Sequence, residues 1–84
     1  MSDQLIIVYG TRWCGDCVRT RYYLDNNQIP YQWINIDTDK GAERIVLELN
    51  HGMRSVPTII FPDGSHLVEP TEQQLERKIK GVVS

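Results

Sequence analysis

Two cysteines, Cys14 and Cys17, are the residues of this 84-residue chain with the clearest capacity for chemistry. Because only two residues separate them, their thiols can close a small disulfide ring and reopen it, a redox cycle that neither could carry out alone. Two other uses of the pair stay open, as small apolar residues or as half of a zinc site. The zinc interpretation is the weaker, since a structural site takes four ligands and the chain adds two distant histidines.

The two thiols differ in their position along the chain. A thiolate, not a thiol, attacks a disulfide, and a free cysteine has a pKa of about 8.5. Cys14 comes just before an expected helix, where unpaired backbone N–H groups and the helix dipole favour an anion, and Arg12 could add positive charge. Cys14 is therefore the predicted nucleophile. Cys17, within the first helical turn, is the predicted resolving thiol that attacks a mixed disulfide at Cys14.

The residues around the cysteines allow more than one role. Asp16 places a negative charge near both thiols, which opposes their ionisation, but a carboxylate in the first turn of a helix is also favoured by the dipole. Trp13 fits a packing residue better than a substrate platform. An aromatic side chain beside the nucleophile could nevertheless line the apolar side of a groove, and the two uses are compatible.

Length and composition limit the remaining possibilities. The chain has room for one domain, residues 1–84, and its 40% hydrophobic and 24% charged residues are typical of a globular protein. A net charge of −2 with scattered basic residues predicts no binding to nucleic acid or to a membrane surface. The start of the chain has no basic region followed by an apolar one, so we expect the protein to stay in the cytoplasm. In that compartment a disulfide is usually catalytic or redox-sensing. We also expect it to be a monomer.

Three segments can position the cysteines. Residues 5–9 are an apolar, β-branched run that predicts a strand buried on both faces. Residues 18–26 lack Gly and Pro and predict a helix. Residues 31–37 alternate in character and predict a second strand. The three segments form a βαβ unit, whose strands are parallel and whose connection is right-handed.

The expected helix has two different faces. Residues suited to burial recur at helical spacing: Cys17, Thr20 and Leu24. Arg19 and Arg21 are expected on the exposed face. The resolving thiol should therefore point into the protein.

The pattern of the next part of the chain predicts a helix and a hairpin. Residues 39–50 carry apolar side chains at helical spacing and predict an amphipathic helix whose buried residues are Ala42, Ile45, Val46 and Leu49. Residues 56–61 predict a strand, and Pro57 must lie at its start because proline cannot donate to a ladder. A tight-turn signal at 62–65 joins this strand to a short one at 66–69, so the two should pair antiparallel.

A capping box opens the last predicted helix, with Thr71 as N-cap and Gln74 three residues later. Leu75, Ile79 and Val82 supply its buried side. The predicted order is strand-helix-strand-helix-strand-strand-helix around a four-stranded mixed sheet, which is an α/β fold.

These motifs together resemble the glutaredoxin branch of the thioredoxin superfamily. The W-C-G-x-C stretch (Trp13–Cys17), the V-P-T segment (Val56–Thr58) and the D-G-S turn (Asp63–Ser65) are most similar to the glutaredoxin-like mycoredoxins. The resemblance covers nearly the whole chain. It implies a thioredoxin fold of the glutaredoxin type, in which three helices flank a four-stranded mixed sheet in the order βαβαββα.

The resemblance also implies a site around Pro57. Its peptide bond would be cis and would face the cysteines, which leaves the Val56 backbone free to pair with a bound peptide or thiol. The chain departs from most glutaredoxins between the cysteines. Gly15 stands where proline is usual, and Asp16 where an aromatic residue is usual.

For the small thiol, the resemblance implies carboxylate-binding residues. Arg54 matches a basic position that holds the glycine carboxylate of glutathione, and Arg12 could help. Gly64 and Ser65 would receive the ligand's α-carboxylate through backbone N–H and hydroxyl groups. His66 follows where many glutaredoxins have an aspartate for the glutamyl amine.

The implied function is a thiol-disulfide oxidoreductase that reduces mixed disulfides with mycothiol or glutathione, without a tightly bound cofactor. Cys14 would suffice for this monothiol reaction, and Cys17 would serve disulfide-containing proteins. A second possibility is a hydrogen-donor redoxin reduced directly by a flavin disulfide reductase such as thioredoxin reductase. A third is a non-enzymatic carrier, in which Cys14 thiolates of two chains and two small thiols bind an iron–sulfur cluster.

Overall fold

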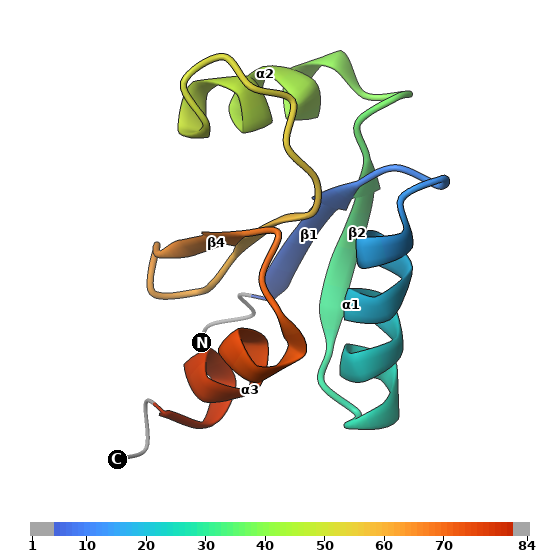
Figure 1. Ribbon diagram of the computed structural model, residues 1–84. Helices are drawn as coiled ribbons and strands as arrows, with labels where there is room; N and C mark the ends of the chain where they lie inside the picture. Colours follow the sequence, from blue (N-terminus) through green and yellow to red (C-terminus); the bar gives the residue numbers. More distant parts are fainter. Residues whose placement is uncertain (1–4, 82–84) are drawn as a thin grey trace.

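Helices cover both faces of one central sheet in the computed structural model, which describes residues 5–81 (Figure 1). The elements in chain order are β1 (Ile6–Gly10), α1 (Gly15–Asn26), β2 (Tyr31–Asn35), α2 (Lys40–Leu49), β3 (Thr58–Ile60), β4 (His66–Val68) and α3 (Glu72–Gly81). This order confirms the prediction for every element. Among residues 5–81, no helix has the length and apolar character required to cross a membrane.

The sheet has the strand order β2-β1-β3-β4. β1 and β2 are parallel, as the helical crossover requires, with Ile6 opposite Tyr31 and Gly10 opposite Asn35. β3 pairs antiparallel with both β1 and β4. The end of β1, which leads to the cysteines, therefore lies beside the start of β3, which follows Pro57.

Three strands are shorter than their patterns predict, and β4 ends at Val68, one residue before its expected end. β2 ends at Asn35, because this residue begins a turn in which its side chain accepts the Asp37 N–H at 2.9 Å and its carbonyl accepts the Thr38 N–H at 3.2 Å. β3 begins at Thr58, directly after Pro57, which has no N–H to donate.

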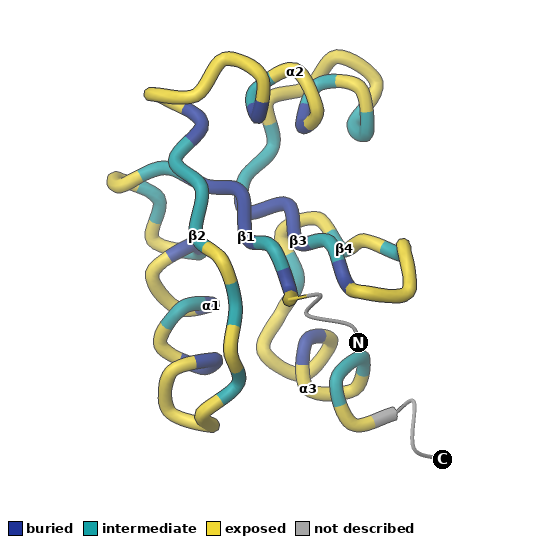
Figure 2. The backbone as a smooth tube through the Cα atoms, turned by 180° about the vertical axis from the view of Figure 1, so that it is seen from behind, coloured by how far each residue is buried: buried dark blue, intermediate teal, exposed yellow. Residues whose placement is uncertain are grey.

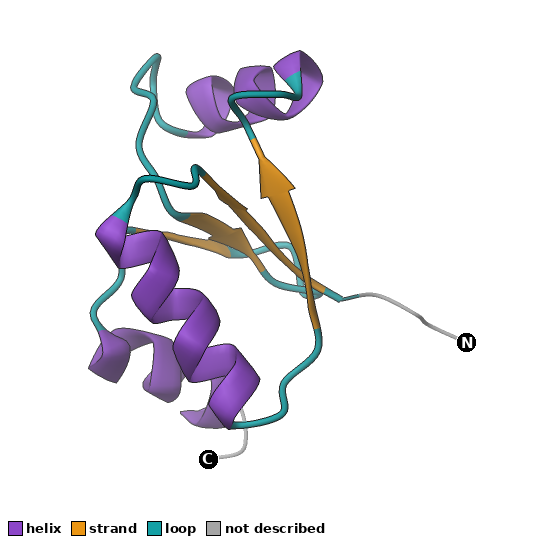
Figure 3. Cartoon of the chain, turned by 90° about the vertical axis from the view of Figure 1, so that its right-hand side faces the viewer, coloured by secondary structure: helices purple, strands orange, loops and turns teal. Residues whose placement is uncertain are grey.

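The core has one cluster on each face of the sheet. Figure 3 shows α1 and α3 on one side and α2 on the other. The buried residues of the α1/α3 side are Ile6, Val8, Tyr23, Leu24, Ile59, Phe61 and Leu75. Those of the α2 side are Tyr9, Ile36, Ala42 and Val46. Burial is deepest along β1 and β3 (Figure 2), so the strands that lead to the cysteines and to Pro57 form the buried centre of the protein.

The faces of α1 and α2 differ from the prediction in one residue each. The predicted buried side of α1 is confirmed. Arg21, however, is partly buried, because its guanidinium stacks on Trp33. On α2, Ala42 and Val46 are buried but Ile45 is 40% exposed, because only the side of the helix that carries Ala42 and Val46 packs against the sheet.

The capping box of α3 is confirmed by two reciprocal hydrogen bonds. The Gln74 N–H donates to Thr71 Oγ1 at 3.0 Å, and the Thr71 N–H donates to Gln74 Oε1 at 2.9 Å. Leu75 is buried and Ile79 is partly buried. Val82 lies outside the described residues.

Candidate active site

Cys14 is the N-cap of α1, in the position that its place before the helix predicted. Its backbone is extended (φ −89°, ψ 116°), and its Sγ accepts the Cys17 N–H at 3.1 Å. The sulfur thus takes the place of the oxygen that usually satisfies a free N–H group at the start of a helix. The partly exposed Sγ therefore lies at the end of the helix that carries partial positive charge.

The segment before β3 faces Cys14 across the end of the sheet. The Val56–Pro57 peptide bond is cis, as the family resemblance implied. Cys14 Sγ lies 3.7 Å from the Val56 carbonyl oxygen, to which its thiol donates. The fold therefore brings Cys14, Val56 and Pro57 together from segments 42 residues apart.

Cys17 is completely buried. A Cβ atom added to Gly10 would lie 2.5 Å from Cys17 Sγ and 2.8 Å from the Trp33 ring, so the glycine leaves the space that the sulfur occupies. Burial and, next, a hydrogen bond with the Cys14 side chain raise the pKa of Cys17 to about 12. Cys17 is therefore a protonated thiol at neutral pH while both cysteines are reduced.

Asp16 and Trp13 have surroundings that bear on their open roles. The Asp16 carboxylate forms an ion pair with Arg19 in the first turns of α1, so its charge is partly balanced. Trp13 is 89% exposed. It packs against nothing that would bury it, so the packing interpretation of Trp13 is wrong and its role as an exposed surface beside Cys14 stays open.

Arg54 lies before Val56, as the chain requires, but its guanidinium is already engaged. It donates from Nε to Glu43 Oε2 at 2.7 Å and forms a second ion pair with Asp37. These carboxylates belong to α2 and to the turn after β2. A ligand carboxylate would compete with both. Arg12 is exposed, two residues before Cys14.

Gly64 and Ser65 lie at the far end of the β3–β4 hairpin. β4 pairs Val68 with Thr58 and His66 with Ile60, so the turn lies one strand length from Pro57. The Ser65 N–H and hydroxyl both donate to Asp63 Oδ1, at 2.9 and 2.6 Å. The structure does not bring this turn together with Cys14, so the prediction that it binds a ligand of Cys14 is corrected.

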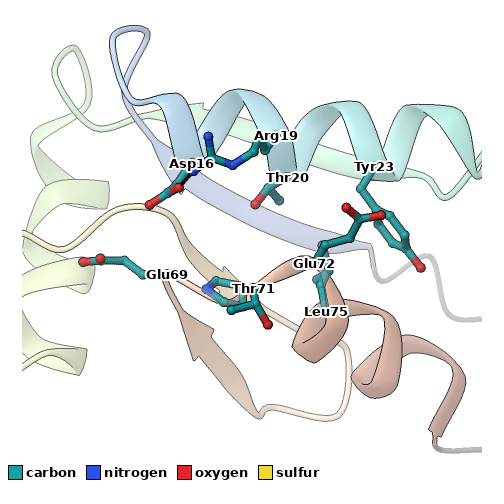
Figure 4. Close-up of a pocket in the computed structure, with 9 residues that line it drawn as sticks. Asp16, Arg19, Thr20, Tyr23, Glu69, Thr71, Glu72 and Leu75 are labelled. Atoms are coloured by element: carbon teal, nitrogen blue, oxygen red, sulfur yellow. Dashed lines mark ion pairs between the residues drawn. The ribbon is translucent and has the colours of Figure 1, made fainter.

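A groove that the prediction missed lies at the near end of the same hairpin. The Glu69 N–H donates to the Pro57 carbonyl oxygen at 2.8 Å, which fixes the segment after β4 beside the site. This segment and α1 enclose a cavity of about 360 Å³. Figure 4 shows side chains from α1 facing those from the start of α3 across it. The lining residues are Asp16, Arg19, Thr20, Tyr23, Glu69, Pro70, Thr71, Glu72 and Leu75.

The sequence contained a signal for this groove. In an antiparallel hairpin, the residue that follows the second strand lies beside the residue that precedes the first. The segment 69–71 therefore had to lie near Pro57, and the turn at 62–65 had to lie away from it. The hairpin register therefore excludes the turn motif from the surroundings of Cys14, although the family resemblance implies a ligand-binding role for it.

Comparisons with known proteins find one family along most of the chain. Residues 6–67 match the family model described as Glutaredoxin. A Mycobacterium tuberculosis protein (strain H37Rv) that is named as a glutaredoxin is 36% identical to this chain over 79 residues, which is 94% of each chain. Mycoredoxin 1 of Corynebacterium glutamicum is 32% identical over 77 residues, covering 92% of this chain and 95% of that protein.

Solved structures give the same fold. The glutaredoxin of Archaeoglobus fulgidus superposes with a TM-score of 0.75 at 24% identity, covering 95% of this chain and 90% of that one. A buckwheat glutaredoxin in complex with glutathione gives 0.66 at 25% identity, covering 90% of this chain and 69% of that one. The four-stranded mixed sheet with three helices is thus a thioredoxin fold of the glutaredoxin type.

Proposed function

Because the chain belongs to the glutaredoxin family, we propose that it is a thiol-disulfide oxidoreductase that reduces mixed disulfides with a low-molecular-weight thiol and also protein disulfides. One observation carries the proposal. Cys14 Sγ is partly exposed, accepts the Cys17 N–H at 3.1 Å and lies beside the cis Val56–Pro57 bond, whereas Cys17 is buried. One thiol of the pair can meet a substrate, and the other waits behind it.

The first step is attack by the Cys14 thiolate on a disulfide. A bond forms between Cys14 Sγ and one substrate sulfur, the substrate S–S bond breaks, and the other sulfur leaves as a thiolate. The Cys17 N–H and the start of α1 face the attacking sulfur, so they stabilise its negative charge before the attack. Arg12 and the exposed Trp13 flank the place where the substrate arrives.

The second step has two branches. A small thiolate attacks the substrate-derived sulfur, forms a disulfide with it and releases the Cys14 thiolate, which resolves the mixed disulfide and needs no second cysteine. Alternatively, Cys17 loses its proton to solvent and attacks Cys14 Sγ, forming the Cys14–Cys17 disulfide and releasing the bound sulfur as a thiolate. The first branch suits mixed disulfides of small thiols, and the second suits disulfides of proteins.

The charges of the groove support mycothiol over glutathione as the small thiol. Three carboxylates line it, from Asp16, Glu69 and Glu72, and Arg19 already pairs with Asp16. Arg54 is likewise paired. Glutathione carries two carboxylates and one ammonium group, a net negative charge that this arrangement repels, whereas mycothiol carries no carboxylate. The name of the relative mycoredoxin 1 points the same way. We expect the reaction to take place in the cytoplasm.

The test is to offer the oxidised protein mycothiol, glutathione, and thioredoxin reductase with NADPH in three parallel reactions. Counting free thiols by mass spectrometry measures recovery. We expect mycothiol to restore Cys14 and Cys17 fastest. Recovery with the reductase alone would instead make the protein a hydrogen-donor redoxin, and recovery with none of the three would contradict the proposed function.

A further inference from the structure

Arg21 is held beside the resolving cysteine by two contacts from β2. It lies one helical turn after Cys17, on the same side of α1. Its guanidinium carbon is 4.2 Å from the centroid of the Trp33 ring, and its Nε donates to the Tyr31 hydroxyl at 3.4 Å. A cation stacked on an indole ring in this way is attracted to the ring face.

The ring under Arg21 also borders Cys17. The Trp33 ring edge and Cys17 Sγ both lie within 3 Å of the point where a Gly10 Cβ would be, so sulfur and ring are neighbours across Gly10. Arg21, Trp33 and Cys17 therefore form one contiguous cluster between α1 and β2. Neither the nucleophile Cys14 nor the groove explains why a partly buried arginine is fixed there.

We propose that Arg21, stacked on Trp33, is a positioning residue that promotes the loss of the Cys17 proton in the resolving step. The inference rests on the proposed function, in which Cys17 attacks a mixed disulfide at Cys14. In that step the Cys17 proton passes to solvent, a Cys14–Cys17 bond forms, and the substrate sulfur leaves with the electron pair of the broken bond. The oxidant is the mixed disulfide itself.

The groups that face Cys17 explain why one positive charge matters there. From its own helix these are Arg21 and Cys14, from the segment after β1 the Thr11 backbone, and from β2 the uncharged Trp33. Burial and the Cys14 side chain raise the pKa of Cys17, while Thr11 and Arg21 lower it. Once Cys14 is bonded to a substrate it no longer carries a negative charge, so Arg21 then remains as the charged group that acts on the resolving thiol.

The test separates the two steps in a single turnover. Reduced protein is mixed with excess 5,5′-dithiobis(2-nitrobenzoate), which releases one coloured thionitrobenzoate when Cys14 attacks and a second when Cys17 resolves. We expect Arg21→Gln to leave the first phase unchanged, to slow the second and to move its pH profile to higher pH. For each unit by which the substitution raises the pKa of Cys17, the second phase should slow about threefold to fourfold. The thiolate fraction falls tenfold, but a thiolate of higher pKa is intrinsically more nucleophilic, which offsets part of the loss.

Three further variants make the result decisive. Arg21→Lys retains the charge and should recover part of the rate, and Arg44→Gln, on the exposed side of α2, should behave as wild type. Cys17→Ser should lose the second phase, and wild type without such a phase would contradict the part of the proposed function in which Cys17 resolves the mixed disulfide. If wild type shows both phases and Arg21→Gln leaves the pH profile of the second unchanged, or slows both phases equally, the role of Arg21 is refuted.

Discussion

Cys14 lies at the N-cap of α1, partly exposed, with the Cys17 N–H and the Val56 carbonyl as its neighbours. Cys17 lies one helical turn later and is completely buried against Gly10 and Trp33. Three positions along one helix thus separate a thiol that a substrate can reach from a thiol that only its partner can reach. The difference shows that the C-x-x-C spacing supplies a pair, while the surrounding strands decide which member does what.

The largest expected effect comes from replacing each thiol in turn. Cys14→Ser should abolish reduction of mixed disulfides and of protein disulfides, because no other reduced sulfur is exposed at the site. Cys17→Ser should retain mixed-disulfide reduction and lose most protein-disulfide reduction. Steady-state assays with one substrate of each kind measure both. Residual wild-type activity in Cys14→Ser would remove the distinction between the thiols.

A methyl group at Gly10 should disturb the surroundings of the buried thiol and leave those of Cys14 intact. The added Cβ of Gly10→Ala would lie 2.5 Å from Cys17 Sγ and 2.8 Å from the Trp33 ring, so one of them must move. We expect a loss of about 1–3 kcal/mol in the free energy of unfolding, the usual cost of overpacking. Denaturant unfolding measures this loss. Gly41→Ala, on α2, is the matched control, since its Cβ would meet nothing closer than 3.5 Å.

The raised pKa of Cys17 predicts how stability depends on pH. In the folded protein this pKa is about 12, and in the unfolded chain it returns to about 8.5. Between these values the unfolded chain releases the proton and the folded protein keeps it, so stability falls as pH rises through this window. Cys17→Ala should lose stability with pH less steeply than wild type. Parallel curves from denaturant unfolding at several alkaline pH values would show that Cys17 is not protected.

The smallest expected effect on stability comes from Trp13. Because the side chain is 89% exposed, Trp13→Ala should change the free energy of unfolding by less than about 0.5 kcal/mol. Any loss of activity in this variant then reflects contact with substrate beside Cys14. Thermal melting and kcat/KM for mixed and protein disulfides, measured on the same preparation, distinguish the two. A large drop in stability would restore the packing role.

The fold could be predicted from the sequence because its signals are local. The apolar run before Gly10, the helical spacing of Cys17, Thr20 and Leu24, and the Thr71–Gln74 capping box each fix one element from neighbouring residues. The order of the elements then restricts the sheet to few topologies. The unequal roles of the cysteines followed from the same local fact, that one precedes the helix and the other lies inside it.

The parts of the site that were missed depend on contacts between distant segments. Two such contacts are the ion pairs of Arg54 with Asp37 and Glu43 and the stacking of Arg21 on Trp33. The partners are far apart in the sequence, and no helical or strand periodicity relates their positions. The sequence therefore predicts that Arg21 is exposed on α1, whereas a residue of β2 holds it partly buried. The groove at Glu69 is different, because the register of the hairpin already predicts that the segment after β4 lies beside Pro57.

The most direct test of the central claim is the pH dependence of alkylation at each cysteine. Reduced protein is treated with iodoacetamide across the neutral and alkaline range, and the modified positions are quantified by peptide mass spectrometry. The account predicts modification of Cys14 throughout this range, while Cys17 stays unmodified until the pH approaches the raised pKa of about 12 or the protein unfolds. Equal rates for Cys14 and Cys17 at neutral pH in the folded protein would contradict it.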